Sequence, residues 1–432
     1  MEIEDRIWHP YTRFSEIEGS QFPTITRGEG IYLFDDQGNR FVDAISSWWA
    51  CSLGHGHPRI IRAIRDQTAC LQHSILGNLS HPTALALAQR LSDVVGGHRH
   101  VHFASDGSAA IEAALKIAVQ YHHNLGRSSK YSFLTLADSY HGDTLGAVSV
   151  GYTEAFHRTF KPLLFKTLNT QIPNCTLCKR SLRAGACSAP CFETTEHVLR
   201  KYAPQLAGVV VEPLCQGTAG MRMYGAGYLA RLAKTCRDLE IVLIVDEIAT
   251  GFGKTGQMFA FEHAQIRPDI VCVGKALSAG YLPISAAIVS DEIYNTFNDK
   301  PDDHSFYHGH TFAGNPIAAA AALATLDLFA EEQLVARGRE LGHILEQELQ
   351  PLSTEGYIRD VRCLGIIGAI ELGPDEKTGR AHAQRVRKTM LDRNILLRPL
   401  GSVVYLLMPL TTPGPILRDT TRTLVETIQS NA

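Results

Sequence analysis

Between about residues 100 and 290, short apolar runs alternate with amphipathic segments, and this alternation constrains the fold more than any other feature of the sequence. The segments at 108–123 and 227–240 place apolar residues at helical spacing. Strand, helix, strand in repetition predicts an α/β fold with a mostly parallel sheet covered on both faces. Ligands then bind beyond the carboxyl ends of the strands. The expected strands are VHFAS (101–105), FLTLAD (133–138), LAGVVVEPL (206–214), IVLIVDE (241–247) and DIVCVGKAL (269–277).

After about residue 330 the pattern changes to α+β. A long charged helix is expected at 331–352, followed by the strand-like segment YIRDVRCLGIIGAIEL, a helix near 379–393 and a closing helix. The first 60 residues contain short strands, such as those of GIYLFDDQGNRFVDA, which we expect to join this smaller domain. The predicted division is therefore a large domain at 61–325 and a small domain made of 1–60 and 326–432.

The composition is that of an ordinary globular protein. The chain has 432 residues, 45% apolar and 20% charged, with a formal net charge of −3. No basic stripe is present, which makes nucleic acid an unexpected partner. The N-terminus MEIEDRIWHPYT has no apolar signal-peptide core, and the apolar stretch 315–330 is too short to span a membrane. That stretch is expected to form a buried helix, and the protein is expected to be cytoplasmic.

Ten cysteines are present, and four of them are clustered as CxxC, eight residues, CxxxC. Four thiolates could hold a structural zinc ion, but the gap between the pairs is short for a ribbon-type site. We predict no metal ligands here, with zinc as the open alternative to a plain surface loop. The clustered residues are Cys175, Cys178, Cys187 and Cys191. The others, most of them expected in the core, are Cys51, Cys70, Cys215, Cys236, Cys272 and Cys363.

The stretch DEIATGFGKTG (246–256) contains Gly-Lys-Thr, which is half of a phosphate-binding P-loop. A P-loop needs glycine where this chain has Ile248. Asp246 and Glu247 would also repel a phosphate at the end of the strand. A P-loop ATPase built around Lys254 is therefore a weak alternative.

Polar residues follow several predicted strands, where parallel strands bring their ends together. A desolvated lysine can condense with an aldehyde, and a helix N-terminus can bind a phosphate. A carboxylate can keep a pyridine nitrogen protonated, and a tyrosine can stack on the ring. These are the requirements of pyridoxal 5′-phosphate. Each residue alone has an ordinary structural explanation, such as a helix cap, but their order along the chain favours the cofactor. The residues are Gly107, Ser108, Tyr140, His141, Asp246 and Lys275.

Two motifs carry a family resemblance over essentially the whole chain. VDEIATGFGKTG (245–256) and GKALSAGYLPISA (274–286) resemble the class III, ornithine-aminotransferase-like enzymes of fold type I. The resemblance implies a transaminase that uses pyridoxal 5′-phosphate. It implies that Lys275 holds the cofactor aldehyde and moves the proton, while Asp246, supported by Glu212, binds the ring nitrogen.

The same resemblance implies the remaining cofactor contacts. Gly107 and Ser108 would bind the phosphate, and Tyr140 would stack on the ring. Thr311 would reach the phosphate in the partner subunit, so a homodimer with shared active sites is expected. A non-catalytic binding protein with this fold would need neither Lys275 nor an aspartate at the ring nitrogen.

Further segments are similar to the branch of this family that acts on 7-keto-8-aminopelargonate in biotin biosynthesis. The similarity implies formation of 7,8-diaminopelargonate with S-adenosylmethionine as the expected donor. Lysine as donor, or another class III ω-aminotransferase acting on a diamine or ω-amino acid, is the alternative. The segments are WHPYT (8–12), SSWWA (46–50), YHGDTLGAVSVG (140–151), EPLCQGTAGMRMY (212–224), HGHTFAGNP (308–316) and RPLGSVVYLLMP (398–409).

The branch also implies a substrate pocket. Arg398 suits a bidentate grip on a carboxylate, and Trp48 suits an apolar chain or a stacked adenine. The implied substrate-binding residues are Tyr11, Trp48, Tyr140, Gly309, Arg398 and Tyr405.

Three positions depart from the family pattern. Lys254 replaces the usual arginine, so a planar guanidinium group that can form two parallel hydrogen bonds becomes a compact ammonium group. Asp106 stands beside the expected phosphate site, where its charge needs an explanation. His310 stands where some members have proline, which leaves lysine open as the donor.

Overall fold

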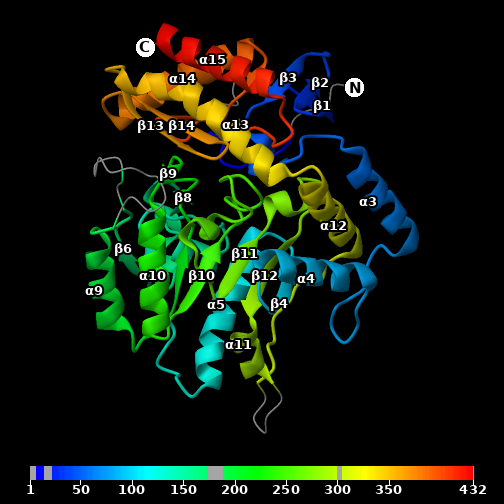
Figure 1. The fold of residues 1–432 in the computed structure, drawn as a ribbon, viewed down its shortest axis with the longest axis vertical. Helices are drawn as coiled ribbons and strands as arrows, with labels where there is room; N and C mark the ends of the chain where they lie inside the picture. Colours follow the sequence, from blue (N-terminus) through cyan, green and yellow to red (C-terminus); the bar gives the residue numbers. More distant parts are fainter. Residues whose placement is uncertain (1–5, 14–21, 174, 176–187, 299–303, 432) are drawn as a thin grey trace.

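A seven-stranded sheet lies at the centre of the computed structural model, which describes residues 6–13, 22–173, 175, 188–298 and 304–431 (Figure 1). The strand order is β4-β12-β11-β10-β7-β5-β6, and within this sheet only β12 runs against its neighbours. The predicted mostly parallel α/β sheet is confirmed. Its strands are β4 (Arg99–Ala104), β5 (Ser132–Leu136), β6 (Leu168–Thr170), β7 (Leu206–Val211), β10 (Val242–Asp246), β11 (Ile270–Val273) and β12 (Ser285–Ser290).

Both faces of this sheet are buried, which explains why its strands read as continuous apolar runs. Along β10, Leu243 and Val245 belong to one core cluster, whereas Val242 and Ile244 belong to the other. The second cluster is closed by α5 (Gly107–Asn124), whose alanine-rich surface lies against the strands. Each fully buried aliphatic side chain stabilises the fold by roughly 1.5–3 kcal/mol relative to an exposed one.

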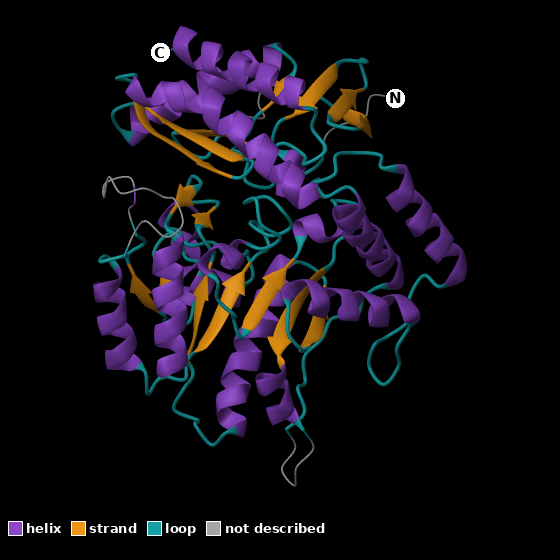
Figure 2. Cartoon of the chain, viewed as in Figure 1, coloured by secondary structure: helices purple, strands orange, loops and turns teal. Residues whose placement is uncertain are grey.

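The three helices expected in this region are present (Figure 2). α5 and α10 (Ala226–Asp238) match the amphipathic segments. The alanine-rich stretch forms α12 (Pro316–Glu331), which packs on α3 (Pro58–Cys70) and α4 (Pro82–Val95). The Asn315 side chain caps α12 by accepting the amide of Ile317 at 3.0 Å. Within the described ranges no helix is long and apolar enough to cross a membrane.

Three strands end two or more residues earlier than expected. β11 stops at Val273 rather than at residue 277, because Gly274 is extended and Lys275 turns into the left-handed region with φ 44°. β5 stops at Leu136, two residues before Asp138 with φ 59°, and β7 stops at Val211. Positive φ at a non-glycine residue costs on the order of 1–2 kcal/mol, and such residues gather at functional sites.

The first and last parts of the chain share a sheet, because β15 (Ile395–Leu396) pairs in parallel with β3 (Arg40–Asp43). This pairing supports the proposed grouping of 1–60 with 326–432, whose boundaries remain a prediction. A second sheet, β13-β14-β16, is packed against α13 and α14. The other strands of these two sheets, and the helices of the C-terminal region, are β1 (Ile25–Glu29), β2 (Tyr32–Asp35), β13 (Ile358–Leu364), β14 (Ile367–Leu372), β16 (Val403–Leu406), α13 (Leu334–Leu349), α14 (Glu376–Asp392) and α15 (Gly414–Ser430).

The clustered cysteines fall partly outside the described residues. Cys178 and Cys187 are among the undescribed positions, whereas Cys175 is half-buried and Cys191 is exposed. The zinc alternative for this loop therefore stays a hypothesis. Among the scattered cysteines most are buried, as predicted, with Cys363 half-buried and Cys70 exposed.

Candidate active site

The carboxyl ends of five strands, β4, β5, β7, β10 and β11, bring the predicted cofactor residues other than Thr311 into one cavity of about 320 Å³. β10 ends at Asp246, and Lys275 lies two residues beyond the end of β11. Tyr140 follows β5, and Gly107 opens the helix after β4. The cavity is lined by Trp49, Asp106, Gly107, Ser108, Tyr140, His141, Gly142, Glu212, Asp246, Ile248, Ala249 and Lys275.

The Asp246 carboxylate is oriented by two contacts. Its Oδ2 lies 2.7 Å from Nδ1 of His141, and its Oδ1 accepts the amide of Ile248 at 3.0 Å. The His141 ring is fully buried, and in the described structure its Nε2 has no hydrogen-bond partner. With the proton on Nδ1, His141 donates a hydrogen bond that holds the Asp246 carboxylate in place. The sequence singled out His141 only as a polar residue after a strand, not as the partner of Asp246.

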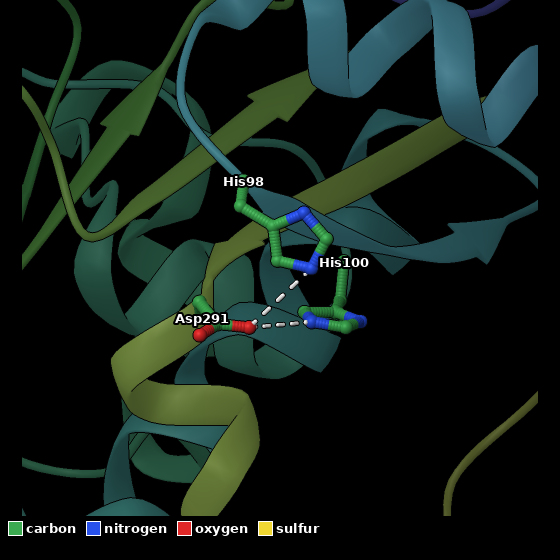
Figure 3. A group of neighbouring side chains, drawn as sticks. All are labelled: His98, His100 and Asp291. Atoms are coloured by element: carbon green, nitrogen blue, oxygen red, sulfur yellow. Dashed lines mark hydrogen bonds and ion pairs between the residues drawn. The ribbon is translucent and has the colours of Figure 1, made fainter.

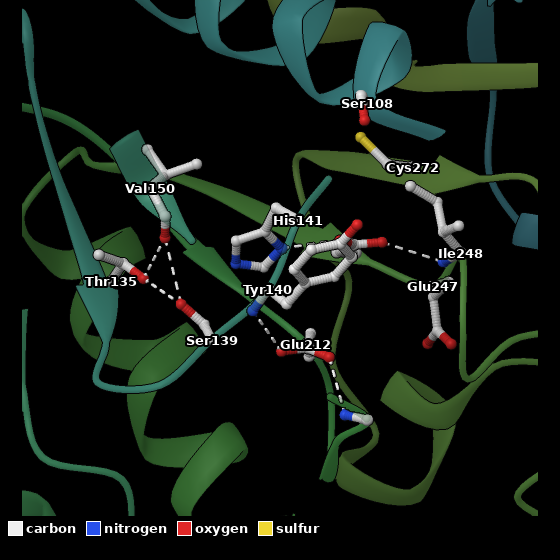
Figure 4. Close-up of polar contacts among 12 residues, drawn as sticks. Ser108, Thr135, Ser139, Tyr140, His141, Val150, Glu212, Glu247, Ile248 and Cys272 are labelled. Carbon is white, nitrogen blue, oxygen red and sulfur yellow. Dashed lines mark hydrogen bonds and ion pairs between the residues drawn. The ribbon is translucent and has the colours of Figure 1, made fainter. Parts of the chain in front are cut away.

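Glu212 lies near Asp246, but its hydrogen bonds go elsewhere. Its carboxylate accepts the amides of Tyr140 at 3.0 Å and of Gly217 at 2.9 Å. Burial raises the pKa of Glu212 to about 7. The hydrogen bond from a side chain to Asp246 comes from His141, whereas Glu212 acts less directly by fixing the backbone that carries the Tyr140 ring (Figure 4).

The loop that presents Tyr140 is fastened at two further points. The Thr135 and Ser139 hydroxyls both donate to the Val150 carbonyl, at 2.6 and 3.1 Å (Figure 4). The Tyr140 hydroxyl donates to Asp143 at 2.9 Å. Burial, together with contacts to the Tyr11 hydroxyl and the Asp143 carboxylate, raises the pKa of Tyr140 far above its ordinary value. The phenol therefore stays neutral, and these hydrogen bonds hold the loop where the Tyr140 ring lines the cavity.

The helix that begins at Gly107 points its N-terminus into the same cavity. Gly107 and Ser108 are its first two residues, so their amides precede the helical hydrogen-bond ladder. The Asp106 side chain accepts the amide of Ala109 at 3.0 Å. Asp106 is thus the N-cap of α5, which explains this departure from the family pattern. Gly142, at φ 121°, has no room for a Cβ, which would lie 1.9 Å from Oγ of Ser108.

The Lys275 amine lies where two cavities meet. Its Nζ is 4.9 Å from the centre of the Trp49 ring, and no hydrogen bond to it is found from any described residue. Burial lowers the pKa of Lys275, while the nearby Asp246 and Glu212 carboxylates act in the opposite direction. A lysine with a lowered pKa has a larger fraction of neutral amine, which is the form that attacks a carbonyl carbon.

A second cavity of about 960 Å³ adjoins the first. Five predicted substrate residues line it: Tyr11, Trp48, Tyr140, Arg398 and Tyr405. Gly309 and Thr311 are exposed and line neither cavity of this chain. These two residues are therefore not brought to the site by the fold of a single subunit.

The SSWW motif forms a left-handed turn, α2 (Ser46–Trp49), with φ values of 50°, 44°, 68° and 72°. Buried Asp43 holds this turn by accepting the amide and hydroxyl of Ser47, at 2.9 and 2.7 Å. His55 contacts the same carboxylate at 2.9 Å. Although burial acts to lower the pKa of His55, the Asp43 hydrogen bond raises it to about 9. The strained turn is thus tied down by a charged pair.

The two tryptophans of this turn have different environments. Trp49 is buried, and its Nε1 donates to the Tyr405 hydroxyl at 3.0 Å. Trp48 is 38% exposed and faces the larger cavity, where the guanidinium carbon of Arg398 lies 4.3 Å from its ring centre. The aromatic ring and the cation therefore form one wall of the larger cavity.

The P-loop alternative is excluded by the position of Lys254. Its side chain is completely buried, and its Nζ donates to the Ala249 carbonyl at 3.1 Å. It lines neither cavity, so the replacement of the family arginine does not place a point charge against the substrate. The Lys254 carbonyl accepts the amide of Ile366 at 2.9 Å, which fastens the aspartate loop to the C-terminal region.

Replacing Lys254 by methionine is expected to stabilise the protein at neutral pH by a few kcal/mol. Burial lowers the pKa of Lys254 from 10.5 to about 7. Between those values the unfolded chain binds more protons, so wild-type stability rises with pH, and below pH 7 the full cost of the buried charge is present. The urea concentrations at the unfolding midpoints of the wild type and of Lys254→Met should therefore approach each other as the pH is raised from 7 to 10. Parallel curves, like those expected for the exposed control Lys234→Met, would contradict this prediction.

The residues present fit pyridoxal 5′-phosphate. An amine, a buried carboxylate, a helix N-terminus and an aromatic ring all face one cavity, and the amine still lacks a hydrogen-bond partner among the described residues. These groups match the aldehyde, ring nitrogen, phosphate and ring face of that cofactor.

Comparison with known proteins agrees with this geometry. The sequence model of class-III aminotransferases matches residues 15–428. Adenosylmethionine-8-amino-7-oxononanoate aminotransferase of Methanocaldococcus jannaschii is 37% identical, over 94% of this chain and 93% of that protein. Its crystal structure superposes with a TM-score of 0.92 over 98% of this chain and 97% of that one. A PLP-bound amine transaminase from an uncultivated Pseudomonas species is 30% identical, with a TM-score of 0.89 over 99% and 98%.

Proposed function

Since the chain belongs to the class-III aminotransferase family, we propose that it converts 7-keto-8-aminopelargonate to 7,8-diaminopelargonate in biotin biosynthesis, with S-adenosylmethionine as donor. The acceptor, also called 8-amino-7-oxononanoate, is named in the relatives that match nearly the full chain. The observation that carries the proposal is that Tyr11, Trp48 and Arg398, from distant segments, line the cavity beside Lys275.

The chain's own residues supply positioning and proton transfer. Bound pyridoxal phosphate provides the carbonyl carbon that takes an amino group from the donor and gives it to the acceptor. Asp246, held by His141, would hold the proton on the ring nitrogen. The Nζ of Lys275 would accept the proton from the substrate carbon and return it, since its lowered pKa increases the fraction of neutral amine that can accept a proton. Tyr140 and Trp49 line both cavities beside the amine.

The larger cavity suits an acceptor with a carboxylate and an apolar chain. Arg398 would bind the carboxylate, and its side chain is oriented by stacking on Trp48. Tyr11 lies edge-on to Trp48 with ring centres 6.0 Å apart, so the two rings form an apolar wall. The same wall would accept the adenine of the donor.

We infer in addition that two subunits complete each site. The support is that Thr311 and Gly309 are exposed and lie outside both cavities of their own chain. They are flanked by Tyr307 and Phe312, which are 83% and 64% exposed. Such apolar exposure suits a surface that a second copy covers. The cytoplasmic location expected from the sequence stays a prediction.

The test is to measure product formation with defined amino donors and acceptors. Purified holoenzyme is given 7-keto-8-aminopelargonate with S-adenosylmethionine or lysine, and 7,8-diaminopelargonate is measured. Product with S-adenosylmethionine alone supports the proposal, and product with lysine alone reassigns the donor. If diamines or ω-amino acids react and this acceptor does not, the chain is another ω-aminotransferase. Solved ω-transaminases with TM-scores of 0.88–0.89 make that the second candidate.

Replacing Arg398 by alanine is expected to raise KM for the carboxylate acceptor by about 10- to 100-fold, the range expected when a charged hydrogen-bonded contact worth roughly 1.5–3 kcal/mol is lost. The visible spectrum of the bound cofactor should not change, because Arg398 does not line the smaller cavity. Arg398→Lys is the matched variant, which keeps the charge but loses the fork. A lost cofactor band in Arg398→Ala would instead make this residue structural.

A further inference from the structure

Two histidines and one aspartate meet at the edge of the central sheet opposite the active site. His98 and His100 stand two residues apart at the start of β4, and Asp291 begins α11 (Asp291–Tyr294) directly after β12. β12 pairs antiparallel with β4 so that Ser290 lies across from Arg99. This register places Asp291 beside both imidazole rings, which point toward its carboxylate (Figure 3).

The distances between the ligand atoms of these three side chains suit a tetrahedral metal ion. Asp291 Oδ1 lies 3.0 Å from Nε2 of His100 and 3.7 Å from Nε2 of His98. Bonds of roughly 2.0–2.2 Å to zinc in a tetrahedron place neighbouring ligand atoms about 3.3–3.5 Å apart. The two observed separations bracket that value. All three ligand atoms lie within 4.8 Å of one another, and the His98 side chain, 78% exposed, is free to close the remaining distance.

Neighbouring side chains orient these ligands. Asn295 donates to Asp291 Oδ2 at 2.9 Å, which leaves Oδ1 facing the histidines. The His100 ring stacks on Tyr294, with ring centres 3.5 Å apart and planes within 6°. Ligand carboxylates and imidazoles of metal sites are commonly held by such outer contacts.

We propose that His98, His100 and Asp291 bind a divalent transition metal ion, with Zn²⁺ as the favoured ion and water as the fourth ligand. Imidazole and carboxylate together suit zinc better than the hard cations. The ion would tie the start of β4 to the start of α11, in addition to the β4–β12 hydrogen bonds. The cluster lies at the amino end of β4, whereas the cofactor cavity lies beyond its carboxyl end. The site is therefore structural rather than catalytic.

The test is zinc titration of holoenzyme that has been stripped with a chelator and dialysed, against a chromophoric competitor. The clustered cysteines are first replaced by serine, so that thiolates do not contribute. We expect one Zn²⁺ per chain. His100→Ala should weaken binding by more than about 100-fold, and Asn295→Ala by about 10-fold, because outer contacts typically contribute 10- to 100-fold. His343→Ala, an exposed histidine on α13, is the control and should bind as tightly as its parent.

A second measurement covers the case in which the serine variant does not fold. Zinc K-edge absorption of the unaltered chain should then show a site with nitrogen and oxygen ligands, lost in His100→Ala. Transaminase activity should be the same in both proteins. The proposal is overturned if zinc binds equally well to His100→Ala, if it is bound only through sulfur, or if no zinc is retained against the competitor.

Discussion

Lys275→Ala is expected to abolish transamination, with a loss of kcat beyond the roughly 10²- to 10⁴-fold range of a single lost acid–base group. The loss should exceed that range because the same amine both holds the cofactor and moves the proton. Lys275 projects from a left-handed residue into the junction of two cavities, and among the described residues no other lysine lines either of them. Product formation and the visible cofactor band are the measurements.

The matched control is Lys234→Ala, which removes an exposed lysine paired with Asp238 at 2.5 Å on α10. It should keep wild-type turnover and the cofactor band. After borohydride reduction, the protein mass should include the cofactor in Lys234→Ala but not in Lys275→Ala. Near-wild-type turnover by Lys275→Ala would show that the reactive amine lies elsewhere.

Much of the fold could be predicted because its strands are buried on both faces. A strand such as β10 has apolar residues at every position before Asp246, and this pattern is visible without any tertiary information. The residues at which the strands end were harder to predict from the sequence. β11 ends at Val273 because the chain enters a left-handed turn at Lys275, and nothing in the local composition marks that conformation.

The residues of the candidate site could be predicted from the sequence where the order of the strands alone brings them together. Residues after parallel strands must meet at one edge, which is why Asp246 and Lys275 could be linked from their order in the sequence. The His141–Asp246 contact could not be foreseen, because it joins a loop residue to the end of β10, 105 residues away in the sequence, through a buried ring. The role of Asp43 is similar: its carboxylate holds the SSWW turn, and only the fold reveals why four positive φ values are tolerated there.

Asp246→Asn is expected to lower kcat by about 10²- to 10³-fold, comparable to the loss of one pre-organised electrostatic group in a buried site. Asparagine keeps the size and one oxygen for the Ile248 amide. It loses the negative charge that would keep a proton on the ring nitrogen. Its NH₂ group would also face the proton on Nδ1 of His141, which would drive that proton to Nε2. Turnover and cofactor content of the purified variant are the measurements, and unchanged turnover would remove Asp246 from the mechanism.

Two variants of His141 separate orientation from charge. His141→Leu removes the contact with Asp246 and should lower kcat about 10-fold, because the carboxylate keeps its charge but loses one of its two fixed contacts. His141→Asn offers an N–H near the position of Nδ1 and should recover most of the activity. Rescue by asparagine, with a pH profile of kcat like that of the wild type, identifies a positioning residue. If leucine and asparagine are equally impaired, the imidazole itself is required, and if neither is impaired, the Ile248 amide alone orients the carboxylate.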